Sequence, residues 1–343
     1  MVFQDARIDY KFSTELFPNW FPSSTYLRAL CAPAFVRTIA QPYSLVNVHG
    51  TDCVLLGRGK KCITTLHGLE TDLADSLRLA RVVPSGKYAV LLSVGSLKQR
   101  LALKRSDFVF AVSNHIARRV TSMRNDVKVW ITPNGVDTGF FRRANSEELS
   151  RMSRRFGLRE EDQVILFVGR AHIVKGMTVL PKIVRRIVHR VNNAKFVLAG
   201  DSSAKFDPWI PSDVRRSCLC VGKVDDYDLR GLYSLARVQI CPSLYEPFGL
   251  VCLEAMSCGT PVVCFNNGGP SDFVADGING ALVDPFDVEE FAERTIQFAS
   301  DEGFRRKASA EAIRTVVQYD WSCTQRKLRQ SFQEVLSELG YHS

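Results

Sequence analysis

The sequence predicts an α/β protein of two doubly wound, Rossmann-like domains that face each other across a cleft. Three observations support this prediction. Short apolar runs alternate with helical patterns in both halves of the chain, and a segment rich in glycine, asparagine and charge interrupts the alternation at residues 134–148. The length of 343 residues is more than one ordinary hydrophobic core needs. Ligands of such sheets bind at the carboxyl ends of the strands.

Each expected strand is short, apolar on both faces and followed by a helical pattern, which is typical of parallel sheets covered by helices. We expect domains at residues 1–140 and 141–318, followed by an amphipathic helix within 319–343. The sequence leaves open whether this helix caps its own domain or crosses back to the first. The expected strands are 44–50, 61–68, 107–113 and 127–133 in the first half, and 163–170, 194–201, 218–224, 238–243, 261–265 and 280–284 in the second.

The composition is that of a folded protein with neither a disulfide framework nor a membrane span. Apolar residues make up 45% and charged residues 24% of the chain, no apolar run reaches the roughly 18 residues of a membrane helix, and no signal-peptide pattern is present. Most of the 10 cysteines lie in apolar runs, which indicates buried, reduced thiols and a cytoplasmic location. Cys218 and Cys220 have no second pair at metal spacing, so zinc is disfavoured.

The formal net charge of +9 falls almost entirely in the first 140 residues. This asymmetry predicts that the first half meets an anionic partner, although a basic face that only aids solubility remains an alternative. Peripheral contact with an anionic membrane is favoured over nucleic acid, because no stacking aromatic pattern accompanies the basic residues. The basic cluster consists of Lys98, Arg100, Lys104, Arg105, Arg118 and Arg119.

The segment PSLYEPFGLVCLEAMSCGTPVV at 242–263 places two glutamates around the expected start of a helix. Pro247 biases Glu246 away from helical geometry, so the helix can begin only at about residues 248–249. Gly249 allows close backbone approach, and the first amides of the helix form an anion site. Glu254 could accept hydrogen bonds from a neutral diol such as ribose. The alternative, a buried helix with stray acids, would leave Glu254 buried without a partner.

Two further segments end expected strands with candidate ligand-binding side chains. In FVGRAHIVKG, Arg170 and Lys175 follow a strand and suit a diphosphate whose departure they could stabilise without a metal. In TTLHG, His67 ends a strand that should face the other domain, although a lone histidine is often structural. The acids Asp226 and Asp228 could bind a divalent cation, but their place before a helical run favours capping.

Taken together, these segments, with TPNGVD, FVLAGD and GGPSDFVADGINGALVDP, resemble the retaining glycosyltransferases of family 4, which have the GT-B fold. The resemblance covers residues 44–340 and is most specific over 163–290, where Glu-x7-Glu is the hallmark of the family. Residues 1–43 depart from it, because family members normally begin with an apolar strand and a glycine-rich loop. We therefore expect that the N-terminal, acceptor-side domain lacks or has replaced these two features.

The resemblance implies that the second domain binds a nucleotide-sugar donor without a metal or another cofactor. By this resemblance Arg170 and Lys175 hold the diphosphate, Glu254 binds the ribose and Glu246 lies near the donor sugar. The implied catalytic residues are His67, Arg170, Lys175 and Glu246, and the implied donor-binding residues are Gly169, Arg170, Lys175, Val224, Glu246, Phe248, Gly249, Leu250, Val251 and Glu254.

In the resembling family, Val224 matches a position beside the nucleobase, residues 248–251 match the turn whose amides meet the sugar and phosphates, and His67 lies beside the transferred sugar. The expected function is transfer of a hexose, with retention, to a hydroxyl of a lipid-linked or glycan acceptor. The alternative is a non-catalytic, sugar-nucleotide-binding homologue that acts as a partner or regulator. A dinucleotide oxidoreductase is disfavoured because no G-x-G-x-x-G follows a strand.

Overall fold

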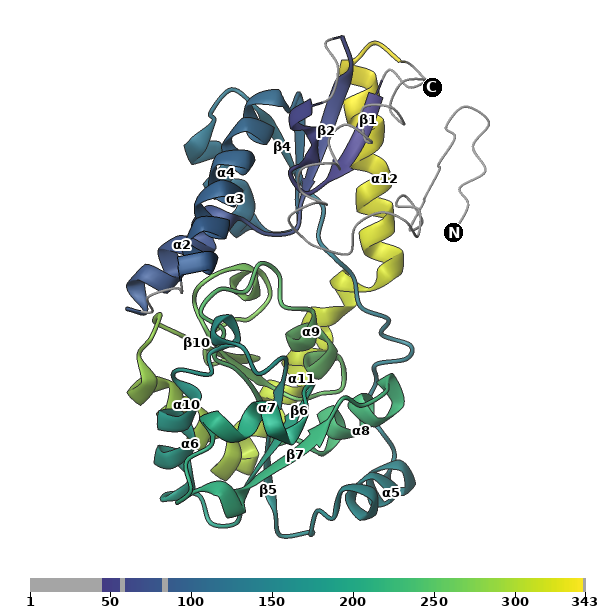
Figure 1. Ribbon diagram of the computed structural model, residues 1–343. Coiled ribbons are helices and arrows are strands. Elements are labelled where there is room, and N and C mark those ends of the chain that lie inside the picture. The colour runs from purple at the N-terminus through teal and green to yellow at the C-terminus, as the bar shows by residue number, and fades with distance from the viewer. Residues whose placement is uncertain (1–44, 56–58, 82–85, 342–343) are drawn as a thin grey trace, which may run out of the picture.

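The computed structural model describes residues 45–55, 59–81 and 86–341. These residues form two α/β domains, each built on a parallel sheet (Figure 1). The prediction of two parallel-sheet domains is therefore confirmed. The expected departure at residues 1–43 lies outside the described residues.

The first domain carries four parallel strands in chain order, β1 (Leu45–His49), β2 (Lys61–Leu66), β3 (Phe108–Ala111) and β4 (Lys128–Ile131). Strands β2 and β3 are buried along nearly their whole length, which explains why their sequences are apolar on both faces. The helical elements of this domain are η1 (Asp52–Leu55), α2 (Glu70–Leu79), α3 (Gly86–Arg105) and α4 (Asn114–Met123).

The second domain has six parallel strands in the order β10-β9-β8-β5-β6-β7. From β5 the chain winds outward to β7, then returns to the other side of β5 to form β8, so the winding reverses between β5 and β8. Ligands of open α/β sheets bind at such a switch point. The strands are β5 (Gln163–Val168), β6 (Ala194–Ala199), β7 (Cys218–Gly222), β8 (Val238–Cys241), β9 (Val262–Phe265) and β10 (Gly280–Val283).

Helices cover both faces of the second sheet, and Figure 1 shows them in teal to yellow around the strands. The α-helices are α5 (Ser146–Phe156), α6 (Leu180–Val188), α7 (Ser203–Phe206), α8 (Asp226–Leu235), α9 (Leu250–Ser257), α10 (Val288–Ser300) and α11 (Glu302–Val316). The short 3₁₀ turns are η2 (Ile173–Lys175), η3 (Asp207–Trp209), η4 (Arg215–Ser217), η5 (Gly269–Asp272) and η6 (Val317–Tyr319).

The last helix, α12 (Trp321–Glu338), lies along the sheet of the first domain (Figure 1). Lys128 Nζ lies 2.6 Å from a carboxylate oxygen of Glu338, and Trp130 Nε1 donates a hydrogen bond of 2.7 Å to Glu334. Val335 is completely buried against this sheet. Helix α12 thus covers one face of a domain that lies almost two hundred residues earlier in the chain. No helix among the described residues is long and apolar enough to cross a membrane.

Two residues of the predicted basic cluster are held in local contacts. Arg119 bonds to Asp72 at 2.5 Å and to Asp75 at 2.9 Å, and Arg105 donates to the carbonyl of Lys60 at 2.9 Å. These contacts join helices and loops within the first domain. The basic cluster is therefore partly structural.

Candidate active site

The loop after β5 is held against the end of β8 by a glycine. Gly176 has φ +86°, and a Cβ built there would lie 2.0 Å from the carbonyl oxygen of Pro242. Only glycine can occupy this position, because it tolerates the left-handed backbone and has no side chain to collide. The approach brings Lys175, the last residue of η2, to the segment that follows β8.

Lys175 and Glu246 form an ion pair at this junction. Lys175 Nζ lies 2.6 Å from Glu246 Oε2, and the Ser243 hydroxyl donates to the same oxygen at 3.2 Å. Burial acts to lower the pKa of Lys175, but the Glu246 carboxylate, with smaller contributions from Cys241 and Cys252, acts in the opposite direction, and the pKa is raised. The side chains are 28% and 13% exposed. The structure therefore places a charged, partly desolvated pair at the switch point of the sheet.

The Glu246 backbone is set by the loop that follows β9. Gly268 has φ +134°, and a Cβ there would lie 2.0 Å from the carbonyl oxygen of Glu246. The amide of Gly269 donates to that same carbonyl at 2.8 Å. Loops from three neighbouring strands, β5, β8 and β9, therefore meet around Glu246.

Helix α9 starts directly beside this ion pair. Gly249, with φ +96°, precedes the helix, and a Cβ there would lie 3.5 Å from Glu246 Cγ. The amides of Leu250 and Val251 have no acceptor within the helix and form its positive end. The side chain of Phe248 packs on Phe273, with ring centroids 5.9 Å apart, so only its backbone is available to a ligand.

Glu254 lies farther along α9 and is held by a phenol that sequence reasoning did not identify. The hydroxyl of the buried Tyr233 donates to Glu254 Oε2 at 2.8 Å. Burial raises the pKa of Glu254, the Tyr233 hydrogen bond opposes this shift, and Asp226 adds to it. Because Tyr233 comes from α8, no local pattern in the sequence pairs it with Glu254.

His67 follows β2 in the first domain and contacts a second histidine. His49 Nδ1 and His67 Nε2 are 2.8 Å apart. Burial lowers the pKa of both rings, and the charge of His67 lowers that of His49 further. The lowered pKa values favour the neutral form of both imidazoles. The signal for His49 was visible in the sequence, since VNVHG and TTLHG both end a strand with histidine and glycine.

The remaining predicted residues lie in the loops after β5 and β7, outside the Lys175–Glu246 ion pair. Gly169 follows β5, and a Cβ there would lie 3.8 Å from Lys175 Cγ. Arg170 is exposed in the same loop, and Val224 packs partly buried after β7. Within the described ranges, neither Arg170 nor Val224 has a hydrogen bond or ion pair to Lys175 or Glu246.

The acids at the start of α8 serve the helix. Asp225 accepts from the amide of Asp228 at 2.8 Å, and Asp228 pairs with Arg155 at 2.7 Å. The capping that the sequence favoured is therefore present, but Asp225 is the capping residue, and Asp226 and Asp228 lie in the first turn of the helix. Among the residues that the structure describes, no three His, Cys, Asp or Glu side chains are grouped to hold a metal ion.

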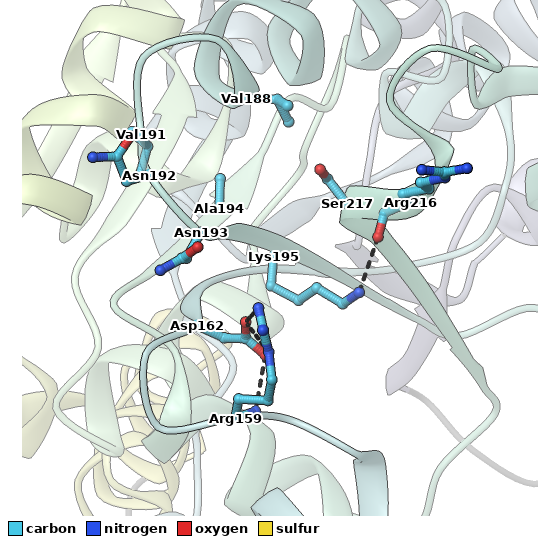
Figure 2. Close-up of a pocket in the computed structure, with 10 residues that line it drawn as sticks. All are labelled: Arg159, Asp162, Val188, Val191, Asn192, Asn193, Ala194, Lys195, Arg216 and Ser217. Carbon is cyan, nitrogen blue, oxygen red and sulfur yellow. Dashed lines mark hydrogen bonds and ion pairs between the residues drawn. The ribbon is translucent and has the colours of Figure 1, made fainter.

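A cavity of about 340 Å³ lies elsewhere on the second domain (Figure 2). Two of its basic residues bind neighbouring groups, since Lys195 donates to the carbonyl of Arg216 at 3.1 Å and Arg159 pairs with Asp162 at 2.9 Å. Asp162 precedes β5 and Ala194 begins β6. The cavity therefore lies at the amino ends of the strands, opposite the candidate site.

Comparison with known families and proteins identifies both domains. Residues 150–315 match the family Glycosyl transferases group 1, and residues 5–140 match Glycosyltransferase Family 4. An uncharacterized glycosyltransferase of Methanocaldococcus jannaschii is 34% identical over 220 residues, which are 62% of this chain and 56% of that protein. A D-inositol 3-phosphate glycosyltransferase of Thermobifida fusca is 30% identical over 60% of this chain and 49% of its own. The chain thus spans about half the length of these relatives.

Solved structures of glycosyltransferases share the fold. Sucrose-phosphate synthase of Thermosynechococcus elongatus superposes with a TM-score of 0.74 at 20% identity, covering 90% of this chain and 78% of its own. The Anabaena protein HepE, solved with UDP and glucose, superposes with a TM-score of 0.70 at 19% identity, covering 92% of this chain and 84% of its own. The two family matches together span nearly the whole chain, and the architecture agrees with them. The chain belongs to the family 4 glycosyltransferases of GT-B fold.

Proposed function

We propose that this protein is a retaining hexosyltransferase that uses a nucleoside-diphosphate sugar and needs no metal. One observation carries the proposal: the Lys175–Glu246 pair, at 2.6 Å, lies beside the open amino end of α9. A cation and free helix amides suit a diphosphate, and a carboxylate beside them suits the hydroxyls of a sugar. The relative HepE, which was solved with UDP and glucose, supports a donor of this kind.

In this proposal the donor lies across the carboxyl ends of β5 and β8. The amides of Leu250 and Val251 and the side chains of Arg170 and Lys175 receive the diphosphate, and Val224 lies beside the base. Glu254, whose Oε2 is already held by Tyr233, accepts hydrogen bonds from the ribose through its other oxygen. Glu246 faces the sugar hydroxyls.

The proposed reaction needs no covalent intermediate on the protein. The bond between the anomeric carbon and the phosphate oxygen breaks, the acceptor hydroxyl forms the new bond on the same face, and its proton passes to the released diphosphate. Lys175, Arg170 and the helix amides stabilise the charge that develops on the leaving group, which is the role a metal has in other transferases. The neutral imidazole of His67 can hydrogen-bond the transferred sugar.

Two variants test the site. Lys175→Ala should lower the rate of transfer about 100-fold, because a cation that stabilises developing charge is lost. Glu254→Ala should weaken binding of the nucleoside diphosphate about 10-fold to 100-fold, because hydrogen bonds to a carboxylate are lost. Calorimetry with nucleoside diphosphates and turnover of their hexose sugars measure the two effects.

Lys195→Ala, in the remote cavity, is the matched control for Lys175→Ala and should leave both quantities unchanged. Undiminished transfer in both purified site variants would contradict the assignment. If the unaltered protein binds the nucleotide tightly but turns over no donor with any hydroxyl acceptor, the non-catalytic alternative is supported instead.

We also propose that the acceptor side faces an anionic lipid surface through helix α3. Val90, Val94, Leu97 and Leu101 follow one another at helical spacing and are 60%, 58%, 59% and 44% exposed. The helix contains no acidic residue, and Arg100 and Lys104 are exposed beside the apolar row. An exposed apolar row with basic flanks suits the interface of a bilayer, and a lipid-linked acceptor would be met there.

A further inference from the structure

Tyr245, the residue before Glu246, reaches into the other domain. Its phenolic oxygen accepts a hydrogen bond of 3.0 Å from the backbone amide of Leu69. Leu69 follows His67 by two residues. The tyrosine is only 4% exposed, and burial, aided by the charge of Asp72, raises its pKa above the usual range. The phenol therefore remains protonated in any ordinary assay and is a permanent partner for this amide.

Pro247, the residue after Glu246, rests on the same turn. A Cβ built on Gly68 would lie 3.1 Å from Pro247 Cγ and 4.0 Å from a ring carbon of Tyr245. The glycine thus allows the two loops to approach closely. The residues on both sides of Glu246 therefore contact the turn that follows His67. We call the four contacting residues the clamp: Gly68, Leu69, Tyr245 and Pro247.

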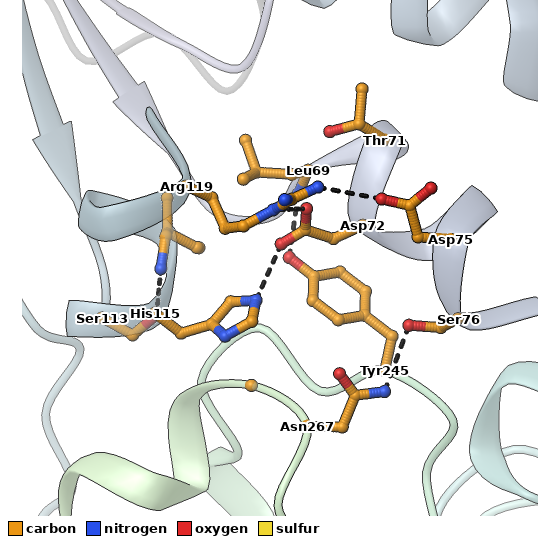
Figure 3. Close-up of polar contacts among 12 residues, drawn as sticks. Leu69, Thr71, Asp72, Asp75, Ser76, Ser113, His115, Arg119, Tyr245 and Asn267 are labelled. Carbon is orange, nitrogen blue, oxygen red and sulfur yellow. Dashed lines mark hydrogen bonds and ion pairs between the residues drawn. The ribbon is translucent and has the colours of Figure 1, made fainter. Parts of the chain in front are cut away.

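The first-domain side of the clamp, Gly68 and Leu69 just before α2, is held in place by neighbouring helices. Figure 3 shows Tyr245 beside Asp72 of α2, which binds His115 at 2.7 Å and Arg119 at 2.5 Å. The amide of Glu70, the first residue of α2, donates to Gln99 on α3 at 2.7 Å. Helices α3 and α4 therefore fix the start of α2, and a loop that bonds to it takes a defined position.

We propose that Tyr245 is a positioning residue that sets the Glu246 loop relative to His67. The proposal rests on the proposed function, in which these two residues act on one sugar from opposite domains. Neither domain alone can fix their separation, and a misplacement of about 1 Å can cost about 100-fold in rate. The clamp joins the two loops within one residue of Glu246 and two residues of His67. It therefore restricts the movement of these two residues relative to each other.

Tyr245→Phe removes the hydrogen bond and keeps the ring, so it tests this role directly. We expect the rate of transfer at saturating donor to fall about threefold to tenfold, the equivalent of one hydrogen bond. The affinity for the nucleoside diphosphate should change by less than about twofold, because the proposed diphosphate and ribose contacts all come from the second domain. Hydrogen exchange of the Leu69 amide should accelerate, whereas the Leu73 amide, bonded to the Leu69 carbonyl at 3.1 Å, should keep its protection.

Thr138→Val is the matched control. The Thr138 hydroxyl donates to Asp320 at 2.6 Å and so ties together the two segments that pass between the domains, but Thr138 contacts neither the Glu246 loop nor the turn after His67. A residue that merely holds the domains together predicts equal losses in both variants, or a parallel loss of nucleotide affinity. Either result, or an unchanged rate in Tyr245→Phe, would overturn the positioning role. A parent protein without transfer activity would instead refute the proposed function. Even then, an unchanged rate of hydrogen exchange at the Leu69 amide in Tyr245→Phe would overturn the clamp.

Discussion

At the scale of single residues, the site depends on positions that have no side chain. Gly176 and Gly268 each bring a backbone to a neighbouring carbonyl at a distance that no Cβ permits. These approaches assemble the loops after β5, β8 and β9, and the Lys175–Glu246 pair is the result. Charged residues carry the proposed chemistry, but glycines decide where those residues lie.

Gly268→Ala should therefore damage the site without touching a ligand. The added Cβ would lie 2.0 Å from the Glu246 carbonyl oxygen, so the loop must move and the ion pair must shift. We expect kcat/KM for transfer to fall about 100-fold. Gly157→Ala is the control, because Gly157 also has a positive φ of +62° but faces open space. It should cost about 1–2 kcal/mol of unfolding free energy with normal activity, and equal activities in the two variants would contradict the argument.

At the scale of elements, the start of α12 is tied to the segment between the domains. Asp320 caps the helix by accepting from the amide of Ser322 at 2.9 Å, and Thr138 donates its hydroxyl to the other oxygen at 2.6 Å. The amide of Trp321 donates to the carbonyl of Val136 at 3.1 Å. The two segments that pass between the domains thus run side by side and are cross-linked by one carboxylate.

Asp320→Asn should lower the free energy of unfolding by about 1 kcal/mol at pH 7, because a neutral amide forms weaker hydrogen bonds with Ser322 and Thr138 than the carboxylate does. Hydrogen bonds from Ser322 and then Thr138 lower the pKa of Asp320 to about 2 from 3.8. A carboxyl with a depressed folded pKa stabilises above its unfolded pKa, and this contribution is lost as pH falls through the folded value. The difference between parent and variant should shrink from pH 4 to pH 2.

Urea unfolding at pH 7, 4 and 2.5 measures this difference. Thr138→Val removes one of the partners and should show a smaller effect with the same pH dependence. A difference between parent and Asp320→Asn that stays constant over this range would show that the carboxylate charge does not contribute.

At the scale of the whole molecule, the domains meet at the carboxyl ends of both sheets. Leu69, after β2, bonds to Tyr245, after β8. The amide of Asn114, after β3, donates to Asp272 at 2.7 Å. Helix α12 returns from the second domain to cover the first (Figure 1). The two domains are therefore coupled through contacts at the candidate site and through helix α12.

The proposed lipid-facing row on α3 predicts binding to anionic vesicles. The protein should float with vesicles that contain phosphatidylglycerol and less with neutral ones, because the basic flanks add electrostatic attraction. Leu97→Asp should weaken this binding at least about tenfold. Ile278→Asp, at a position 57% exposed on the second domain, should leave it unchanged. Equal vesicle binding by the two variants would contradict a lipid-facing role. So would a protein that forms dimers through this row in solution and does not bind vesicles.

Much of the fold was predictable because buried parallel strands are apolar on both faces. The runs at 61–68, 107–113 and 163–170 contain β2, β3 and β5, and Pro247 with Gly249 located the start of α9 within two residues. The buried face of the last helix was less predictable. Trp321 and Leu328 are apolar residues of α12, yet their side chains are 47% and 37% exposed, because that helix buries only a narrow strip.

The sequence by itself determined the local features of the site: which strands end in charged residues, where a helix must begin, and which acid lies inside it. These follow from backbone preferences and periodicity, which act over a few residues. Only the tertiary structure decided which of them meet. The Lys175–Glu246 pair, the Tyr233 bond to Glu254 and the Tyr245 bond to Leu69 join residues 71, 21 and 176 positions apart. Such contacts depend on strand order and on domain packing, which no local pattern encodes.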